Sequence, residues 1–503
     1  MPLLACVTRV PRLTRLEQTR RSAASASALV APLLASLAIG LAGCSTPVLK
    51  PDVAVPAHFA GTVSAVDADP EVAWWDSYAD PVLTDLIRRA AHENRDVKIA
   101  AARVRAARAG ATVSRSWLYP SISAVGTGLH GSRDYDAAQQ QAVPDANLWS
   151  AGVGVSWEID ISGRLRAGAT AAEADALTVE HGARGVRLLV LTDVASNYFT
   201  LVGALRQLET LRAISAAQDE TLRLVTARQR AGLATPFDVE RAQTEASRAR
   251  AAIPPLETLA TVSRHRIAVL IGDQAFNAAS ITTSGSAAVA PPAHAGQPAA
   301  LLERRPDLLA ARAQLDAANA RRQQAHAEWF PRLFLGALFG QGGVELNGVS
   351  LGTARFANAA ALLAMPIFNA GRTQAINDIA EARQSESVLR YEDAIVRALE
   401  DVENALAAVR NQRQRAETLD SASASAEAAL GRAQSLYSRG QVDLLPLLDA
   451  QRTRLTVRVS ANDSQTQLLL DSVQLYKALG GGWQAFDPIT KPAQANAAPS
   501  PNS

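Results

Sequence analysis

The chain has 503 residues, of which 5% are aromatic and two are Met, while Ala, Leu, Arg, Glu and Gln are abundant. This composition favours long helices over a series of compact globular domains. The 50 basic and 48 acidic residues nearly cancel, so the charge gives no reason to expect a nucleic acid or another polyanion as a partner.

The N-terminal residues have the features of a secretory signal. A basic stretch that contains Cys6 precedes an apolar run at about 28–41, which is short for a membrane-spanning helix. The run ends in Leu41-Ala42-Gly43-Cys44, which resembles a bacterial lipobox and implies cleavage after residue 43 and acylation of Cys44. Two acyl chains, palmitate among them, give stable anchoring, and Ser45 favours the outer membrane by analogy with envelope lipoproteins. A plain signal peptide and an uncleaved membrane helix are the alternatives.

Most of the remaining chain reads as two copies of one pattern. Residues 44–79 contain four prolines and predict an extended, lipid-anchored tether, whereas 483–503 predict a disordered tail. Between them, six landmarks recur in the same order, with separations of 207 to 211 residues. The pairs are Tyr119 with Phe330, Gly163 with Gly371, Asn197 with Asn404, Gly232 with Gly440, Ala242 with Ala450, and Gly272 with Gly480. The sequence therefore predicts repeat 1 at 80–275, a linker at 276–300 and repeat 2 at 301–482.

Each copy predicts a helix, two extended segments, a very long helix and a returning helix. The first helices are expected at about 80–117 and 301–329. The long helix of the first copy, at about 165–231, contains no Pro, and roughly 67 residues would extend for about 100 Å. Its apolar residues recur every three or four positions, as Leu188, Leu191 and Ala195 do, which is typical of a coiled-coil seam.

The extended segments have the pattern of membrane strands. In 149–157, every odd position is apolar and every even position is Ser or Gly, so one face is apolar and the other is small and polar. Companion strands are expected at about 120–130, 331–342 and 355–367, with Gly340-Gln341-Gly342-Gly343 as a loop. Strands of this length cross a bilayer in a β-barrel, and a soluble four-stranded sheet is the alternative.

Four strands cannot form a closed barrel, because the smallest known outer-membrane barrels have about eight. In hydrocarbon an open edge is costly, so identical chains must share one barrel. Two chains would give a bore filled by side chains, whereas three give twelve strands and leave room for a lumen. A conduit therefore predicts a homotrimer.

Several segments in order resemble the TolC-like outer membrane factor family, in its lipoprotein branch of efflux-pump and nodulation-type channels. They are Trp74-Trp75, Trp157-Glu158-Ile159-Asp160-Ile161-Ser162-Gly163-Arg164, Arg304-Arg305-Pro306-Asp307-Leu308, Phe330-Pro331, Pro366-Ile367-Phe368-Asn369-Ala370-Gly371-Arg372 and Leu447-Leu448-Asp449-Ala450-Gln451-Arg452. The resemblance implies an α+β membrane protein whose long helices form a trimeric periplasmic α-barrel, continuous with a twelve-stranded β-barrel. It also implies a periplasmic adaptor (membrane fusion) protein and an inner-membrane transporter of the resistance-nodulation-division (RND) class as partners.

The expected junctions and tips follow from the same pattern. The strand–helix junctions are expected at Gly163, Arg164, Pro366, Gly371 and Arg372. The long helices should turn back at Gly232 and Gly440, because a glycine at a helix end tolerates positive φ. Asp238 and Asp443 follow these tips, where they either cap a helix or belong to a gate.

A periplasmic gate is expected near the second tip. Leu445, Asp449 and Arg452 have the spacing of one helix face. The resemblance places them at the family's periplasmic constriction and matches Tyr437 to a gate-linking tyrosine. Pro446 stands where some members of the family have a second aspartate. The resemblance therefore does not decide whether the gate has one acidic ring or two. An exposed Asp–Arg pair without a gating role is the alternative.

Together these observations predict the channel subunit of a tripartite, RND-type efflux system in the outer membrane. It would be a passive exit duct for small molecules, with no enzymatic activity and no cofactor besides the lipid on Cys44. No phosphate-binding loop, metal-ligand spacing or nucleophile motif is present in the sequence. A channel for type I protein secretion and a membrane-anchored coiled-coil scaffold are the alternatives.

Overall fold

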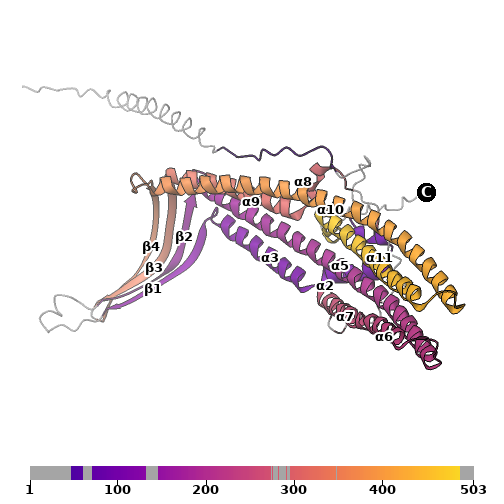
Figure 1. Cartoon of the computed structure of the whole chain (residues 1–503). Coiled ribbons are helices and arrows are strands. Elements are labelled where there is room, and N and C mark those ends of the chain that lie inside the picture. Colours follow the sequence, from indigo (N-terminus) through magenta and orange to yellow (C-terminus); the bar gives the residue numbers. More distant parts are fainter. Residues whose placement is uncertain are drawn as a thin grey trace, which may run out of the picture.

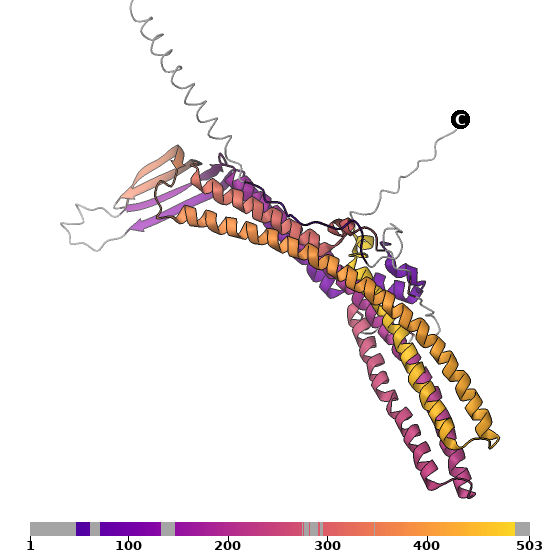
Figure 2. The ribbon, with the colours of Figure 1, turned by 45° about the horizontal axis from the view of Figure 1, so that its top comes forward.

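The computed structural model describes residues 47–60, 71–131, 146–273, 275, 281, 290–291, 295–346 and 348–487. A curved four-stranded sheet lies at one end of the molecule, and long helices lead away from it to two helical hairpin tips (Figure 1). The second view shows both tips at the end opposite the sheet (Figure 2). Cys44, the predicted lipidation residue, lies outside the described residues.

The two halves have the same order of elements. The first half contains η1 (Trp74–Tyr78), α2 (Pro81–Glu93), α3 (Arg95–Ser116), β1 (Ser121–Gly131), β2 (Ala146–Ile159), α5 (Arg164–Arg230), α6 (Pro236–Ala251) and α7 (Ile253–Leu270). The second contains η4 (Pro298–Ala300), α8 (Leu301–Arg304), α9 (Pro306–His326), η5 (Ala327–Trp329), β3 (Arg332–Leu346), β4 (Val349–Ala364), α10 (Arg372–Ser438), α11 (Leu444–Ala478) and η6 (Trp483–Phe486). Both α5 and α10 have 67 residues. The order α3-β1-β2-α5 thus recurs as α9-β3-β4-α10.

The returning helices differ between the two halves. The return from the second tip is one helix, α11, of 35 residues. The return from the first tip is divided into α6 and α7, and two prolines occupy the first turn of α7. Since proline lacks a backbone N–H, it interrupts the helical hydrogen-bond ladder at this point.

The four strands form one antiparallel sheet in the order β1-β2-β3-β4. They have 11, 14, 15 and 16 residues, so each is long enough to cross a bilayer. The predicted alternation is confirmed by the register. Val153 pairs with Phe339 and Trp157 with Leu335 on one face, while Gly152 pairs with Gly340 on the other.

The predicted loop at Gly340–Gly343 is wrong. These residues belong to β3, and the connection to β4 runs through Gly348, which has a φ of +76°. β2 and β3 approach closely at Gly340. A Cβ added there would lie 2.5 Å from the Ala151 carbonyl oxygen. Glycine inside a strand often marks a place where another backbone approaches closely.

The main hydrophobic core lies where the N-terminal helices meet α5, α10 and α11. Trp74 is fully buried and stacks on Tyr476, with ring centroids 5.2 Å apart. The Tyr198 hydroxyl donates to Oδ2 of Asp80 over 2.6 Å, and Asp80 also caps α2 through the N–H groups of Val82 and Leu83. The most apolar 18-residue stretch of α5 is 61% buried within the chain, so packing explains its composition.

Two predicted segments have more structure than expected. Residues 47–60 have no helix or strand, as a tether should, but the predicted tether ends in the buried 3-10 helix η1. The predicted tail begins with η6, where the buried Trp483 donates from Nε1 to the Arg304 carbonyl over 3.0 Å. In both places aromatic rings that bury large areas hold the segment to the core.

Candidate channel strands, junctions and helical tips

The sheet has two open edges within the described part of the chain. β1 pairs only with β2, and β4 pairs only with β3. Because successive strands are antiparallel, β4 runs opposite to β1, and the β1 of a second copy can extend the sheet antiparallel at β4. Unpaired strand edges are not tolerated in hydrocarbon, so a membrane location requires this pairing.

Glycines on one face let the central strands approach closely. A Cβ added at Gly152 would lie 2.5 Å from the Phe339 carbonyl oxygen, and one at Gly342 would lie 2.8 Å from that of Trp149. Gly340 faces Gly152 across the same strand pair. Small residues on one face allow a sheet to bend toward that face, as barrel closure requires.

The predicted junction residues lie where the strands pass into the long helices. Gly163 and Gly371 are the N-caps of α5 and α10, with φ values of +77° and +83°. Arg164 donates to both carboxylate oxygens of Glu158, over 2.7 and 2.8 Å. Pro366 lies between β4 and α10, and Arg372 is exposed at the first position of α10. The two junctions therefore share a backbone geometry and differ in their side-chain contacts.

Asp160 caps the start of α5. Its carboxylate accepts from the N–H groups of Leu165 and Arg166 over 3.1 and 2.9 Å. Partial burial alone would raise the pKa of Asp160, but these N–H groups and the Arg166 side chain hold it below its usual value. The cap therefore keeps its charge, and favours the N-terminus of the helix, at neutral pH.

The two tips have the same backbone turn. Gly232 and Gly440 have φ values of +77° and +70°. The N–H of Leu233 donates to the Arg228 carbonyl and that of Gln441 to the Leu436 carbonyl, both over 2.9 Å. These are Schellman-type helix ends, which confirms the predicted turns. A small apolar cluster joins the hairpins behind them, formed by Val225, Ala242, Leu430, Leu444, Leu447 and Leu448.

The two acidic residues after the tips are arranged differently. Asp238 forms a capping box with Thr235, and the Thr235 backbone N–H and hydroxyl hold the pKa of Asp238 below its usual value. This cap is complete above the ordinary carboxyl pKa and is lost as the pH falls through the lowered value. Asp443 occupies the N-cap position of α11 without a side-chain capping bond. Of the two residues, only Asp238 therefore makes the contacts expected of a helix cap.

The predicted gate residues of α11 share one groove. Leu445, Asp449 and Arg452 line a groove of about 300 Å³ with Arg241 and Glu245 of α6. Arg452 donates to Asp449 over 2.6 Å within α11, and both side chains are more than half exposed. In the single chain, Arg452 therefore contacts an acidic residue of its own helix.

Tyr437 lies outside this groove. The guanidinium of Arg228, on α5, sits 5.0 Å from the Tyr437 ring centroid, which joins the two long helices just before their tips. Sequence reasoning missed Arg228, Arg241 and Glu245. The four-residue spacing of the last two on α6 was the available signal for a shared face.

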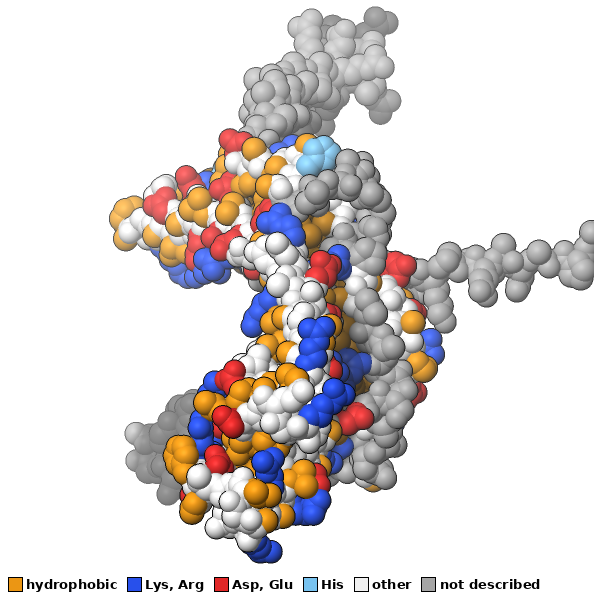
Figure 3. Space-filling view, turned by 45° about the vertical axis from the view of Figure 1, so that its right-hand side comes forward, with side chains coloured by type: hydrophobic (Ala, Val, Ile, Leu, Met, Phe, Trp, Pro, Cys, Tyr) orange, Lys and Arg blue, Asp and Glu red, His pale blue; other side chains and the backbone are white. Residues whose placement is uncertain are grey.

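The charged side chains visible on one face of the molecule are mixed in sign. Basic and acidic side chains alternate over the helical faces that Figure 3 shows, without a large area of one sign. Among the described residues, no three His, Cys, Asp or Glu side chains lie together as a metal site would require. Strands long enough to cross a bilayer, in a sheet with two open edges that leads into long paired helices, fit a subunit of a membrane channel.

Comparison with known proteins agrees with this class. The family model described as outer membrane efflux protein matches residues 86–273 and 298–481. The pyoverdine export outer membrane protein OpmQ of Pseudomonas putida is 32% identical over 473 residues, which are 90% of this chain and 98% of OpmQ. The outer membrane protein OprJ of Pseudomonas aeruginosa is 30% identical over 461 residues, 90% of this chain and 96% of OprJ. A crystal structure of a membrane protein from Pseudomonas aeruginosa has a TM-score of 0.78 at 29% identity and covers 87% of this chain and 97% of its own.

The chain belongs to the outer membrane efflux protein family. It is an outer-membrane efflux channel subunit of a tripartite system, with its strands in the outer membrane and its helices in the periplasm.

Proposed function

We propose that three copies form one passive exit duct for small molecules, which docks to a periplasmic adaptor protein and an inner-membrane transporter of the RND class. The observation that carries this proposal is that β1 and β4 are open edges, and that β1 of one copy can pair antiparallel with β4 of another. Three copies supply twelve strands, enough for a lumen. The duct needs no cofactor of its own, because the inner-membrane partner supplies the energy. The name of OpmQ, a pyoverdine exporter, favours small molecules over the secretion of proteins.

We also propose that Cys44 is acylated and that the tether fixes the lipid beside α10. The Pro47 carbonyl accepts from Gln384 Nε2 over 3.1 Å, and the Asp52 N–H donates to Glu392 over 2.9 Å. Cys44 lies three residues before Pro47, so its lipid starts within about 10 Å of this contact. Metabolic labelling with palmitate should mark the wild-type protein and leave Cys44→Ser unlabelled. Equal labelling of both proteins would show that Cys44 is not the acylated residue.

The tips are proposed to close the duct at its periplasmic end. Three Asp449 carboxylates near one axis repel each other and favour the entry of cations. Arg452 and Tyr437 would oppose opening until the adaptor binds the open state more tightly. Asp443, Asp238 and Leu445 complete the proposed constriction.

Single-channel conductance in planar bilayers tests this gate. Asp449→Ala combined with Arg452→Ala should raise the conductance of the closed level at least twofold, because the charged ring and its Arg contacts are lost. The matched control is Asp393→Ala with Arg397→Ala, which removes an exposed ion pair of 2.8 Å on α10, far from the tips. A closed level that stays unchanged in the first variant, or that rises equally in the control, would disprove the gate assignment.

A further inference from the structure

The helices next to the sheet follow the order of the strands. α3 leads into β1, α5 follows β2, α9 leads into β3 and α10 follows β4. α5 packs between α3 and α9, and α9 packs between α5 and α10. α3 and α10 therefore lie at opposite edges of the helix layer (Figure 1). In the proposed trimer, α10 of one subunit must lie beside α3 of the next, just as β4 lies beside β1.

The internal duplication gives this contact a counterpart within the chain. The contact between α5 and α9 joins the end of repeat 1 to the start of repeat 2. Arg372 lies 208 residues after Arg164, and Phe330 lies 211 residues after Tyr119. We call the contact between α5 and α9 the internal seam, and the contact between α10 and the next subunit's α3 the subunit seam. Because α10 corresponds to α5 and α3 corresponds to α9, each residue pair of the internal seam identifies a residue pair of the subunit seam.

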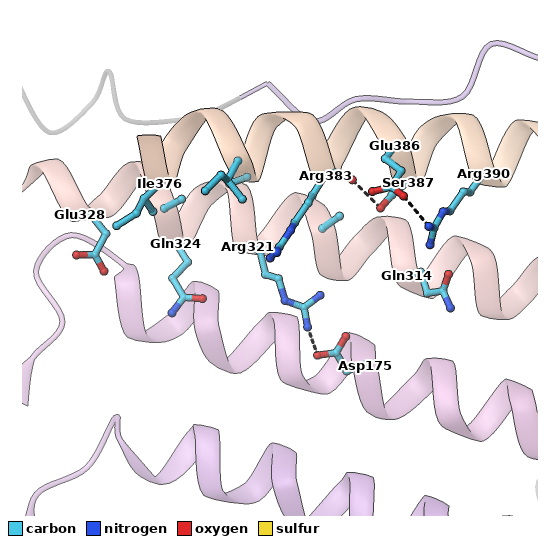
Figure 4. Close-up of a pocket in the computed structure, with 14 residues that line it drawn as sticks. Asp175, Gln314, Arg321, Gln324, Glu328, Ile376, Arg383, Glu386, Ser387 and Arg390 are labelled. Carbon is cyan, nitrogen blue, oxygen red and sulfur yellow. Dashed lines mark hydrogen bonds and ion pairs between the residues drawn. The ribbon is translucent and has the colours of Figure 1, made fainter. Parts of the chain in front are cut away.

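The internal seam includes ionic and polar contacts. Arg321 on α9 forms an ion pair with Asp175 on α5, as Figure 4 shows. Arg164 lies 4.0 Å from Glu328. Gly168 faces Gln324, whose Nε2 would be 3.1 Å from an added Cβ. Arg321 and Gln324 of α9 are among the residues that line a groove over α5.

The corresponding residues of the subunit seam have lost both acids. Asp175 corresponds to Arg383, and Glu328 corresponds to Trp117. Arg321 corresponds to Gly110, a helical glycine with no other atom within 4 Å of an added Cβ. Arg383 points into the groove beside α9 in Figure 4 and has no ion pair among the described residues.

Two further positions are apolar in the subunit seam. Gly168 corresponds to Ile376 and Gln324 corresponds to Val113, which is 60% exposed in the single chain. Arg164 corresponds to Arg372, which would face Trp117, itself 67% exposed. An arginine over an indole face is a favourable cation–π contact. Packing of Ile376 against Val113 removes apolar surface from water.

We propose that the subunits assemble through a seam in which Ile376, Arg372 and Arg383 of one copy pack on Val113, Trp117 and Gly110 of the next. This proposal rests on the proposed trimer and adds the residues through which it forms.

Disulfide cross-linking tests the register of the subunit seam. Ile376→Cys combined with Val113→Cys should give covalent trimers under oxidation, in at least tenfold higher yield than either single variant. The matched control is Ile376→Cys with Ile99→Cys, because Ile99 is also exposed on α3 but lies about 20 Å farther along that helix. The native mass is measured in parallel. A trimer that cross-links through Ile99, or through neither pair, would overturn the seam and leave the trimer intact, whereas a native mass that is not three subunits would overturn the trimer itself.

A charge pair provides a second test that does not depend on cysteines. Val113→Glu alone should lower the trimer fraction at least tenfold, because it places a carboxylate against Ile376. Adding Ile376→Lys should restore the fraction to within threefold of wild type. If the double variant remains as defective as the single variant, the two residues do not meet and the seam is wrong.

Discussion

Gly340→Ala is expected to reduce the yield of trimeric channel at least tenfold. The new Cβ would lie 2.5 Å from the Ala151 carbonyl oxygen, 2.8 Å from Phe356 Cζ and 2.9 Å from Gly152 Cα. Two of these atoms belong to the backbone of the neighbouring strand and cannot rotate away. Overpacking costs about 1–3 kcal/mol per site, and the trimer contains three such sites. The measurement is the fraction of heat-modifiable trimer after extraction in mild detergent.

Gly336→Ala is the matched control for this prediction. Gly336 lies on the same strand and the same face as Gly340, but its added Cβ would meet only the Val155 carbonyl oxygen, at 3.9 Å. This is an ordinary contact, so the control should assemble like wild type. Equal yields for the two variants would show that close approach at Gly340 is not needed for barrel closure.

Arg305→Ala is expected to lower the free energy of unfolding by about 1–3 kcal/mol, because it removes the donor to two buried main-chain carbonyl groups. The side chain is 11% exposed and donates to the carboxylates of Asp307 and Asp401, over 2.7 and 2.9 Å. It also donates to the carbonyls of Ala478, on α11, and Ala398, on α10, over 3.1 and 3.4 Å. One guanidinium thus joins the start of α9 to both helices of the second hairpin.

Arg305→Lys should recover little of this loss, since an ammonium group cannot reproduce the planar set of donors. Burial alone would lower the pKa of Arg305, but Asp307 and Asp401 raise it, so the side chain stays charged at any pH at which the protein is folded. Chemical unfolding followed by helical circular dichroism measures the effect. Arg397→Ala, which removes an exposed pair with Asp393, is the control and should change stability by less than about 1 kcal/mol. An Arg305 variant as stable as this control would contradict the assigned role.

The long helices and their tips could be predicted closely from the sequence. The expected helix at 165–231 is observed as Arg164–Arg230. Its signals are local, because a repeat of three and four residues without proline specifies a helix, and Gly232 specifies its end. The same holds for the alternating residues of β2.

The segments that were mispredicted depend on contacts distant in sequence. The cluster of glycines in β3 has the composition of a loop. Only the close approach of the β2 backbone shows that glycine is needed there inside a strand. η1 is packed by Tyr476, more than 390 residues away, and η6 by the carbonyl of Arg304. The Arg304-Arg305-Pro306-Asp307-Leu308 segment contributed to the family resemblance, but the contact of Arg305 with two other helices became visible only in three dimensions.

The positions of the predicted gate residues could be predicted in part from the sequence. Leu445, Asp449 and Arg452 do share a groove, because helical spacing alone places them on one face. The opposing wall from α6, and the contact of Tyr437 with Arg228, depend on the packing of the hairpins and carry no equally strong local pattern.

The number of subunits in the particle extracted from lipid tests the central claim most directly. Native mass spectrometry of the detergent-extracted protein measures this number. The sheet has two open edges and four strands per chain, so we expect three chains in every folded particle and twelve strands in its barrel. A particle of one or two chains that retains its β-sheet signal would contradict the account.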